Sequence, residues 1–256
     1  MHTGLKKLLN CRHVVFASIL MMAGCATQPA GPGMYYGQQV VMPGYTSFTH
    51  PQTIEHVVGP YETLWRISKT YNVDMDTLIR TNNISNPNKL KKGQRLTIPQ
   101  TRGPRPVISL YPTQRWTHIV IHHTATHEGN ALSIDGIHQR RGFINGMGYH
   151  FIIDNGTNGK IDGQIEVGPR WLKQQNGAHA NAAGMNEKGI GIALVGNFSE
   201  SYVSEGQMAS LIFLVKTLQD YYNIPMSRII RHSDVPTKNT ECPGTHFPWT
   251  TFKNNL

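Results

Sequence analysis

Cysteine, acidic residues and long apolar runs are all scarce in this sequence. Its 256 residues include 3 cysteines, and 15 Asp and Glu stand against 24 Lys and Arg, for a formal charge of +9. A chain of this length can bury enough apolar surface for a medium domain and a small one without disulfides. The basic residues are spread along the chain rather than gathered in one run, which favours a polyanionic surface over base-specific recognition of nucleic acid. We expect no nucleic-acid partner.

The apolar run near the N-terminus is too short to span a membrane. Basic residues precede an apolar stretch over 14–23, which is about half of the ~20 residues that a spanning helix needs. This order is typical of an export signal. The stretch ends in LMMAGC, which resembles the lipobox of bacterial lipoproteins and implies cleavage after residue 24 and lipid on Cys25. The alternative is an ordinary export signal with an incidental cysteine.

The lipobox interpretation has consequences for the other cysteines and for location. Cys11 leaves with the signal and Cys25 carries lipid, so Cys242 is the one thiol of the mature chain and no intramolecular disulfide is possible. Metal ligation is the commonest reason for a lone thiol in an exported protein. The lipid would anchor the chain to a membrane. Ala26 after the lipidated cysteine favours the outer membrane, with the protein facing the periplasm.

Composition divides the chain into segments. Residues 26–53 are rich in Gly, Pro, Gln and Tyr and nearly uncharged, which is typical of a flexible tether. A small region follows the tether, and a second linker follows that region. We therefore expect a signal peptide at 1–24, a tether at 25–53, a small domain at 54–99, a linker at 100–114 and a larger domain at 115–256.

The small region has a βααβ pattern. A short β-run at 56–58 precedes Leu64, Ile67 and Tyr71, whose spacing predicts a helix. A second short helix is predicted after Asp74, and residues 95–98 are predicted to form the last strand. Two strands and two helices can enclose one small core. The segments VVGPYETLWRIS, LIRTNN and LKKGQRLTIP resemble a LysM module. The resemblance implies binding to the N-acetylglucosamine units of peptidoglycan or chitin.

The larger region interleaves apolar strands with a long helix. Strands are predicted for the apolar segments THIVIHH, YHFIID and IGIALVGNF. Ser204 and Gln207 form a possible capping box, and the apolar spacing that follows them predicts an amphipathic helix. The segment RIIRH reads as a last strand with His232 at its end. This order predicts an α/β domain in which helices cover a sheet.

A histidine and cysteine set in this region fits a metal site. Side chains of successive strand residues point to opposite faces, so only one of His122 and His123 can line a given pocket. A lone strand-end histidine is more often an ordinary core or surface group. A His/His/Cys set would nevertheless form from His232, Cys242 and one of the two histidines at 122 and 123. Such a set leaves a fourth position open, which suits catalytic Zn²⁺.

Residues 115–250 resemble the type 2 N-acetylmuramoyl-L-alanine amidases, which include the peptidoglycan recognition proteins. The motifs IVIHHTAT, GYHFIID, GAHANAAGMNEKGIGIALVGNF and RHSDVPTKNTECPG occur in the family's order. The resemblance implies a central mixed β-sheet flanked by helices. It also implies that zinc is held by His122, His232 and Cys242, with His246 a less favoured ligand.

Three further roles follow from the same resemblance. Tyr149 is expected to polarise the scissile carbonyl or hold the developing oxyanion, which a phenol can do without titrating near neutral pH. Thr240 stands where relatives carry either lysine or threonine, so its catalytic contribution is an open question. His179 is expected to contact substrate, although a solvated loop histidine is the alternative.

These expectations point to zinc-dependent hydrolysis of the amide bond between N-acetylmuramic acid and L-alanine of peptidoglycan. Glycan strands would bind residues 54–99, the muramoyl-peptide would bind at the zinc, and the protein would act as a monomer. One alternative is a non-catalytic peptidoglycan binder, and inactive relatives commonly replace the cysteine that is present here as Cys242. Another is a zinc peptidase that cuts the stem peptide.

Overall fold

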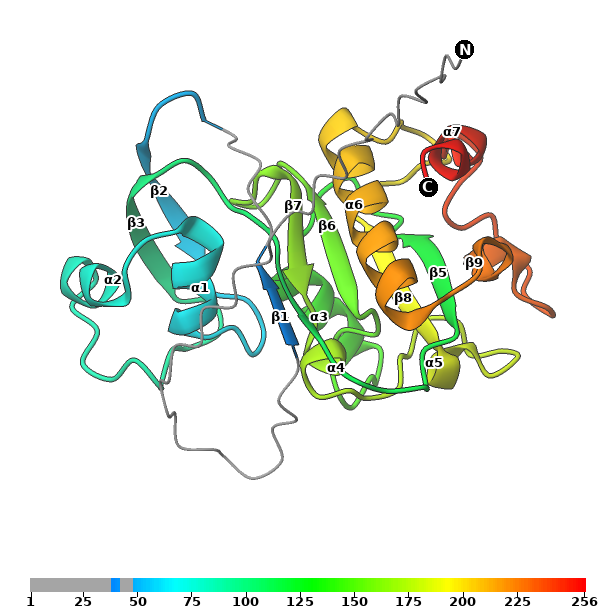
Figure 1. The fold of residues 1–256 in the computed structure, drawn as a ribbon, viewed down its shortest axis with the longest axis horizontal. Coiled ribbons are helices and arrows are strands. Elements are labelled where there is room, and N and C mark those ends of the chain that lie inside the picture. Colours follow the sequence, from blue (N-terminus) through cyan, green and yellow to red (C-terminus); the bar gives the residue numbers. More distant parts are fainter. Residues whose placement is uncertain (1–37, 42–47) are drawn as a thin grey trace, which may run out of the picture. The chain divides into compact units, whose positions relative to one another are not determined.

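The computed structural model describes residues 38–41 and 48–256 (Figure 1). The predicted signal peptide, the lipidation site at Cys25 and most of the predicted tether lie outside these residues. Within the part of the chain that is described, no helix has the length and apolar character needed to cross a membrane.

The segments that flank the small domain pair with each other. Strand β1 (Gln38–Val41) runs antiparallel to β4 (Val107–Leu110). The sequence predicts a tether and a linker at these positions, yet all four β4 residues are buried, and the carbonyl of Ser109 accepts a hydrogen bond from Trp171 Nε1 at 2.8 Å. Within the predicted linker over 100–114, Ile108 and Leu110 of β4 therefore belong to the core of the larger domain.

The small domain has the predicted βααβ order. Strands β2 (Gln52–Val57) and β3 (Arg95–Thr101) pair antiparallel, and α1 (Leu64–Tyr71) and α2 (Met75–Thr81) lie between them in the chain. Thr63 and Asp74 cap the two helices with side-chain oxygens, which satisfies amides that a helix start leaves unpaired. The apolar positions of the helical pattern are buried in one cluster, comprising Val58, Leu64, Ile67, Tyr71, Leu78, Leu96 and Ile98.

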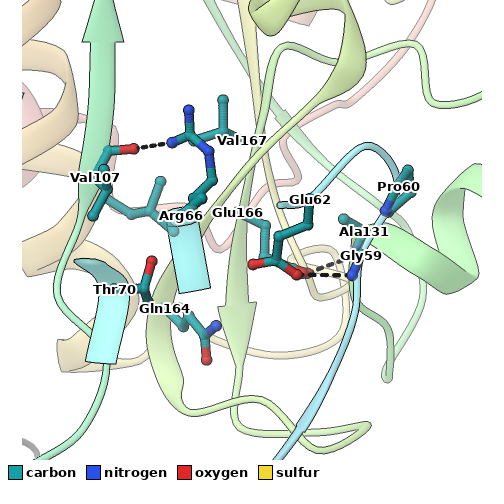
Figure 2. A pocket seen from close by; sticks show the side chains of 11 residues that line it. Gly59, Pro60, Glu62, Arg66, Thr70, Val107, Ala131, Gln164, Glu166 and Val167 are labelled. Atoms are coloured by element: carbon teal, nitrogen blue, oxygen red, sulfur yellow. Dashed lines mark hydrogen bonds between the residues drawn. The ribbon is translucent and has the colours of Figure 1, made fainter. Parts of the chain in front are cut away.

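A buried histidine fixes the loop between β2 and α1. His56 is fully buried, its Nδ1 lies 2.9 Å from the Tyr71 hydroxyl, and its Nε2 lies 2.8 Å from Glu62 Oε2. The same carboxylate oxygen accepts a hydrogen bond from the Gly59 N–H at 2.9 Å, as Figure 2 shows. Burial opposes ionisation of Glu62, but His56 and the Lys160 ammonium outweigh it and lower its pKa to about 2.

Figure 2 shows the polar hollow around these residues. Its lining includes Glu62 and Arg66 from the small domain and Gln164 and Glu166 from the larger one, and the Arg66 guanidinium donates to the Val107 carbonyl. The cavity has a volume of about 20 Å³, which is enough for roughly one water molecule. None of the residues predicted to bind metal lines it, so this hollow is separate from the candidate metal centre.

The larger domain is built on a five-stranded mixed sheet. The strand order is β7-β6-β8-β5-β9, with β6 and β7 antiparallel and the other neighbours parallel. This arrangement confirms the predicted fold class. The strands are β5 (His118–His123), β6 (Phe151–Asn155), β7 (Asp162–Val167), β8 (Gly189–Leu194) and β9 (Ile229–Arg231).

Helices cover both faces of this sheet (Figure 1). The long α6 (Glu205–Tyr222) begins with the predicted Ser204–Gln207 capping box and packs on strand residues such as Ile121 and Ile153. Helix α3 (Ala131–Arg140) packs with Ile152, whose side chain points the other way because strand residues alternate. The shorter helices are α4 (Pro169–Leu172), α5 (Met185–Lys188) and α7 (Trp249–Asn254).

We predict that replacing Glu62 by Gln removes an acid-sensitive part of the stability. Because the pKa of Glu62 is lowered from 4.5 to about 2 on folding, its contribution is present above about pH 4.5 and is lost as the pH falls through 2. The shift corresponds to a contribution on the order of 3 kcal/mol. Urea unfolding of the whole chain between pH 7 and pH 3 should show a weaker pH dependence for Glu62→Gln than for the wild type.

Glu55→Gln provides the control for this measurement. Glu55 pairs with Arg95, but both side chains are more than half exposed, at 53% and 70%, and exposed pairs contribute little. Its substitution should leave the pH dependence unchanged. Equal acid sensitivity of Glu62→Gln and the wild type would contradict the prediction.

Candidate metal centre

Two histidines meet where parallel strands end. Strand β5 pairs in parallel with β9, and Ile121 lies opposite Arg231, so His122 and His232 are the next residues in register. His232 opens a short 3₁₀ turn, His232–Asp234, directly after β9. The two rings lie with centroids 4.5 Å apart. Parallel pairing therefore brings together two side chains that are 110 residues apart in the printed sequence.

The two adjacent histidines of β5 point to opposite faces, as their positions in a strand predict. His122 is 1% exposed and faces His232, whereas His123 Nδ1 accepts a hydrogen bond from the Phe198 N–H at 3.1 Å. His123 therefore stabilises the turn that follows β8 and does not belong to the cluster of candidate metal ligands.

Cys242 completes the set from the loop after His232. Its Sγ lies 3.7 Å from His122 Nδ1 and accepts a hydrogen bond from the His123 N–H at 3.4 Å. Its carbonyl accepts a hydrogen bond from the Ser233 N–H at 2.9 Å, which returns the loop to the strand end. One ligand atom from each of His122, His232 and Cys242 lies within 4.8 Å of the others. The structure thus brings the predicted ligands together.

The site is electrostatically prepared for a cation. Burial lowers the pKa of His122 well below its ordinary value and lowers that of His232 to about 4. Burial also raises the pKa of the Cys242 thiol to about 12, against the opposing effect of the His123 N–H. Two neutral imidazoles are ready donors, and the thiol needs a nearby cation to ionise.

The donor set fits zinc. The Nε2 atom of His232 is buried and has no hydrogen-bond partner among the residues that the structure describes, and such orphaned groups are rare unless something else satisfies them. Three ligands of the His/His/Cys type leave a fourth position open in the tetrahedral coordination that zinc prefers.

Tyr149 lies next to the ligands. Its ring centroid is 5.2 Å from that of His122 and 5.4 Å from that of His138, on α3. Burial, reinforced by Cys242, raises its pKa above the ordinary value. Tyr149 therefore stays a protonated hydrogen-bond donor near neutral pH.

Thr240 has a local structural contact. Its hydroxyl accepts a hydrogen bond from the Cys242 N–H at 3.2 Å, which holds the turn that presents the thiol. The catalytic role suggested for Thr240 remains a prediction. Sequence reasoning missed Lys238, whose positive charge adds to burial in lowering the pKa of His232, and which is the cation of this loop closest in sequence to Thr240.

The two remaining predicted site residues, His246 and His179, have their contacts within the protein. His246, the less favoured ligand, is exposed and stacks on Tyr202 with ring centroids 4.9 Å apart. His179 is buried, and both of its ring nitrogens have partners within the protein, His122 Nε2 and the Gly189 carbonyl. The substrate contact expected of His179 stays a prediction, whereas the alternative of a solvated loop histidine is wrong, because the side chain is buried.

A mixed α/β domain with a His/His/Cys set at one sheet edge matches a known family. A family model described as N-acetylmuramoyl-L-alanine amidase matches residues 112–245, and the LysM domain model matches residues 56–99. The chain therefore belongs to the N-acetylmuramoyl-L-alanine amidase family and carries a LysM domain.

Individual relatives come from animals and bacteria. Peptidoglycan-recognition protein 2 of Holotrichia diomphalia is 31% identical over 140 residues, which are 49% of this chain and 70% of that protein. Peptidoglycan-recognition protein SA of Drosophila melanogaster is 28% identical over 158 residues, 56% of this chain and 69% of that protein. The structure of Endolysine N-acetylmuramoyl-L-alanine amidase LysCS from Clostridium intestinale URNW is 41% identical, with 56% of this chain and 84% of that chain covered and a TM-score of 0.47.

We predict that Cys242→Ser loses tightly bound metal. A serine hydroxyl does not ionise as a thiol does when a cation is near, so the third ligand is lost. Elemental analysis after dialysis should find about one zinc per wild-type chain and close to none in the variant. His246→Ala is the matched control and should keep its zinc. Retention of full zinc by Cys242→Ser would contradict the assignment.

Proposed function

We propose that this protein hydrolyses the amide bond between N-acetylmuramic acid and L-alanine of peptidoglycan in a zinc-dependent reaction. The observation that carries the proposal is the set of buried His122, half-buried His232 and buried Cys242, whose ligand atoms lie within 4.8 Å of one another. These three residues would hold Zn²⁺. Bound in such a site, Zn²⁺ supplies a water of lowered pKa and a Lewis acid for the scissile carbonyl.

Tyr149 is the residue of this chain that is best placed to stabilise negative charge. Its phenol stays protonated because burial raises its pKa. A protonated donor that is already oriented can stabilise the oxyanion of a tetrahedral intermediate without reorganisation during the reaction. The ring lies beside His122, so the donor and the metal would act on the same carbonyl group.

The LysM domain supports a cell-wall substrate. We propose that residues 54–99 hold glycan strands while the muramoyl-peptide is cleaved at the metal centre, as a monomer that remodels or recycles the wall. The predicted signal peptide and the lipid on Cys25 would place the protein outside the cytoplasm, anchored to the outer membrane and facing the periplasm. These assignments rest on the sequence motifs.

A non-catalytic peptidoglycan-binding role is the main alternative. It has support because two relatives are named as peptidoglycan-recognition proteins. The presence of Cys242 within the ligand set favours catalysis, since a protein that only binds glycopeptide has no need of a complete metal site. The second alternative, a zinc peptidase, uses the same metal chemistry on a neighbouring bond and is separated by its products.

We predict that the whole protein releases intact stem peptides from purified sacculi. Cleavage of the muramoyl amide leaves the peptide with a free N-terminal L-alanine, and mass spectrometry of the soluble fraction identifies it. Cys242→Ser should release none while still sedimenting with the sacculi through the LysM domain. Peptides cut within the stem would indicate a peptidase, and binding without release by the wild type would indicate a recognition protein.

We further predict that Tyr149→Phe lowers kcat by roughly 10²- to 10³-fold, the usual effect of removing one oxyanion donor. The zinc content and KM should change little, because phenylalanine keeps the ring and removes only the hydroxyl. Steady-state kinetics on a soluble muramoyl-peptide, together with metal analysis, measure both. An unchanged kcat would show that Tyr149 has only a packing role.

A further inference from the structure

The ring of His179 occupies a slot that two glycines create. A Cβ atom added at Gly177 would lie 2.3 Å from His179 Cδ2, and one added at Gly191 would lie 2.5 Å from the same atom. Both distances are far below van der Waals contact, so a side chain at either position would displace the ring. The packing therefore leaves the ring in one place between its own loop and β8.

The backbone of His179 is held as firmly as its ring. Asn186 Oδ1 accepts hydrogen bonds from the N–H groups of His179 and Ala180 at 2.9 and 3.0 Å. The neighbouring Gly177 N–H donates to the Asn186 carbonyl at 2.7 Å. One asparagine thus fixes the segment that carries the ring.

The partners of the ring determine where its proton is. His179 Nε2 lies 3.1 Å from the Gly189 carbonyl, which can only accept, so Nε2 carries the hydrogen. A neutral imidazole, the ordinary form of histidine above about pH 6.5, has one N–H. His179 Nδ1 is therefore an acceptor.

The acceptor on His179 also determines where the proton of His122 is. Its Nε2 lies 3.0 Å from His179 Nδ1 and must donate to that acceptor. The hydrogen of the neutral His122 ring is then on Nε2, and its Nδ1 carries a free lone pair. That Nδ1 is the atom which faces Cys242 Sγ at 3.7 Å.

We propose that His179 is a positioning residue that sets the tautomer and orientation of His122, with the Gly189 carbonyl of β8 as the fixed end of the chain of hydrogen bonds. The relay leaves His122 Nδ1 unprotonated on the side of Cys242, where the two residues would hold the metal. The inference rests on the proposed zinc site and goes beyond it by assigning a role to a residue that does not touch the metal. Partners of this kind typically alter metal affinity by 10- to 100-fold.

Two amide variants separate the two ends of the relay. In His179→Asn the side-chain oxygen can take the place of Nδ1 and accept from His122. In His179→Gln the amide instead reaches the place of Nε2, toward the Gly189 carbonyl, and the acceptor for His122 is lost. Zinc affinity of the whole protein, measured by chelator competition at pH 7, should fall 10- to 100-fold for His179→Gln and by less than about threefold for His179→Asn.

His150 supplies the matched control. It is a buried neighbour of His179, with ring centroids 5.7 Å apart, and it bonds the Gly191 N–H and the Gln175 carbonyl rather than a metal ligand. His150→Asn should lower the melting temperature without the loss of zinc affinity seen in His179→Gln. The visible spectrum of the Co²⁺-loaded protein gives a second readout and should change for His179→Gln but not for His179→Asn.

The outcomes distinguish this inference from the proposed function. A wild-type protein that binds no zinc would overturn the zinc site itself, and the relay with it. Tight zinc binding by the wild type and equally tight binding by His179→Gln would overturn the relay alone. Equal losses in His179→Asn, His179→Gln and His150→Asn would also overturn it, since they would show that any change in this buried cluster loosens the site.

Discussion

The structure depends on the parallel pairing of β5 with its two neighbours. Because β8, β5 and β9 run in the same direction, their carboxyl ends meet at one edge of the sheet. Strand alternation sends Ile121 into the core under α6 and His122 to the opposite face. A slip of one residue in this register would exchange His122 with His123 and would also move Ile121 out of the core under α6. The same pairing therefore secures the core and the position of the first metal ligand.

Burial serves two purposes at this edge. The apolar surroundings that stabilise the sheet also hold His122 and His232 neutral and oppose ionisation of Cys242. No carboxylate belongs to the ligand set, so a dication would be balanced by one thiolate only. A cation of this charge would offset the cost of burying the thiolate, and metal binding should therefore stabilise the folded chain as well as equip it for chemistry.

The sequence predicts what is periodic or local. It is sufficient for the LysM pattern, the apolar strands and the Ser204 capping box, since each depends on neighbours within a few residues. It is insufficient for β1 and β4, because strands of four residues give too little periodicity and their pairing joins segments about 70 residues apart. The partners of the His179 ring could not be predicted for a related reason: His122 is distant in sequence, and Gly189 contributes a backbone carbonyl. The glycines at 177 and 191 were the sequence signal that a ring packs closely against the backbone there.

The loop at 177–180 links His122, a proposed metal ligand, to Tyr149, the proposed oxyanion donor. The Ala178 N–H donates to the Gly148 carbonyl at 2.9 Å, and a Cβ at Gly148 would lie 2.4 Å from the Ala178 carbonyl oxygen. Gly148 immediately precedes Tyr149, while His179 in the same loop bonds to His122. One short segment therefore contacts both His122 and the residue before Tyr149, and it constrains their relative positions. In the proposed reaction, stabilisation of an oxyanion requires such fixed geometry.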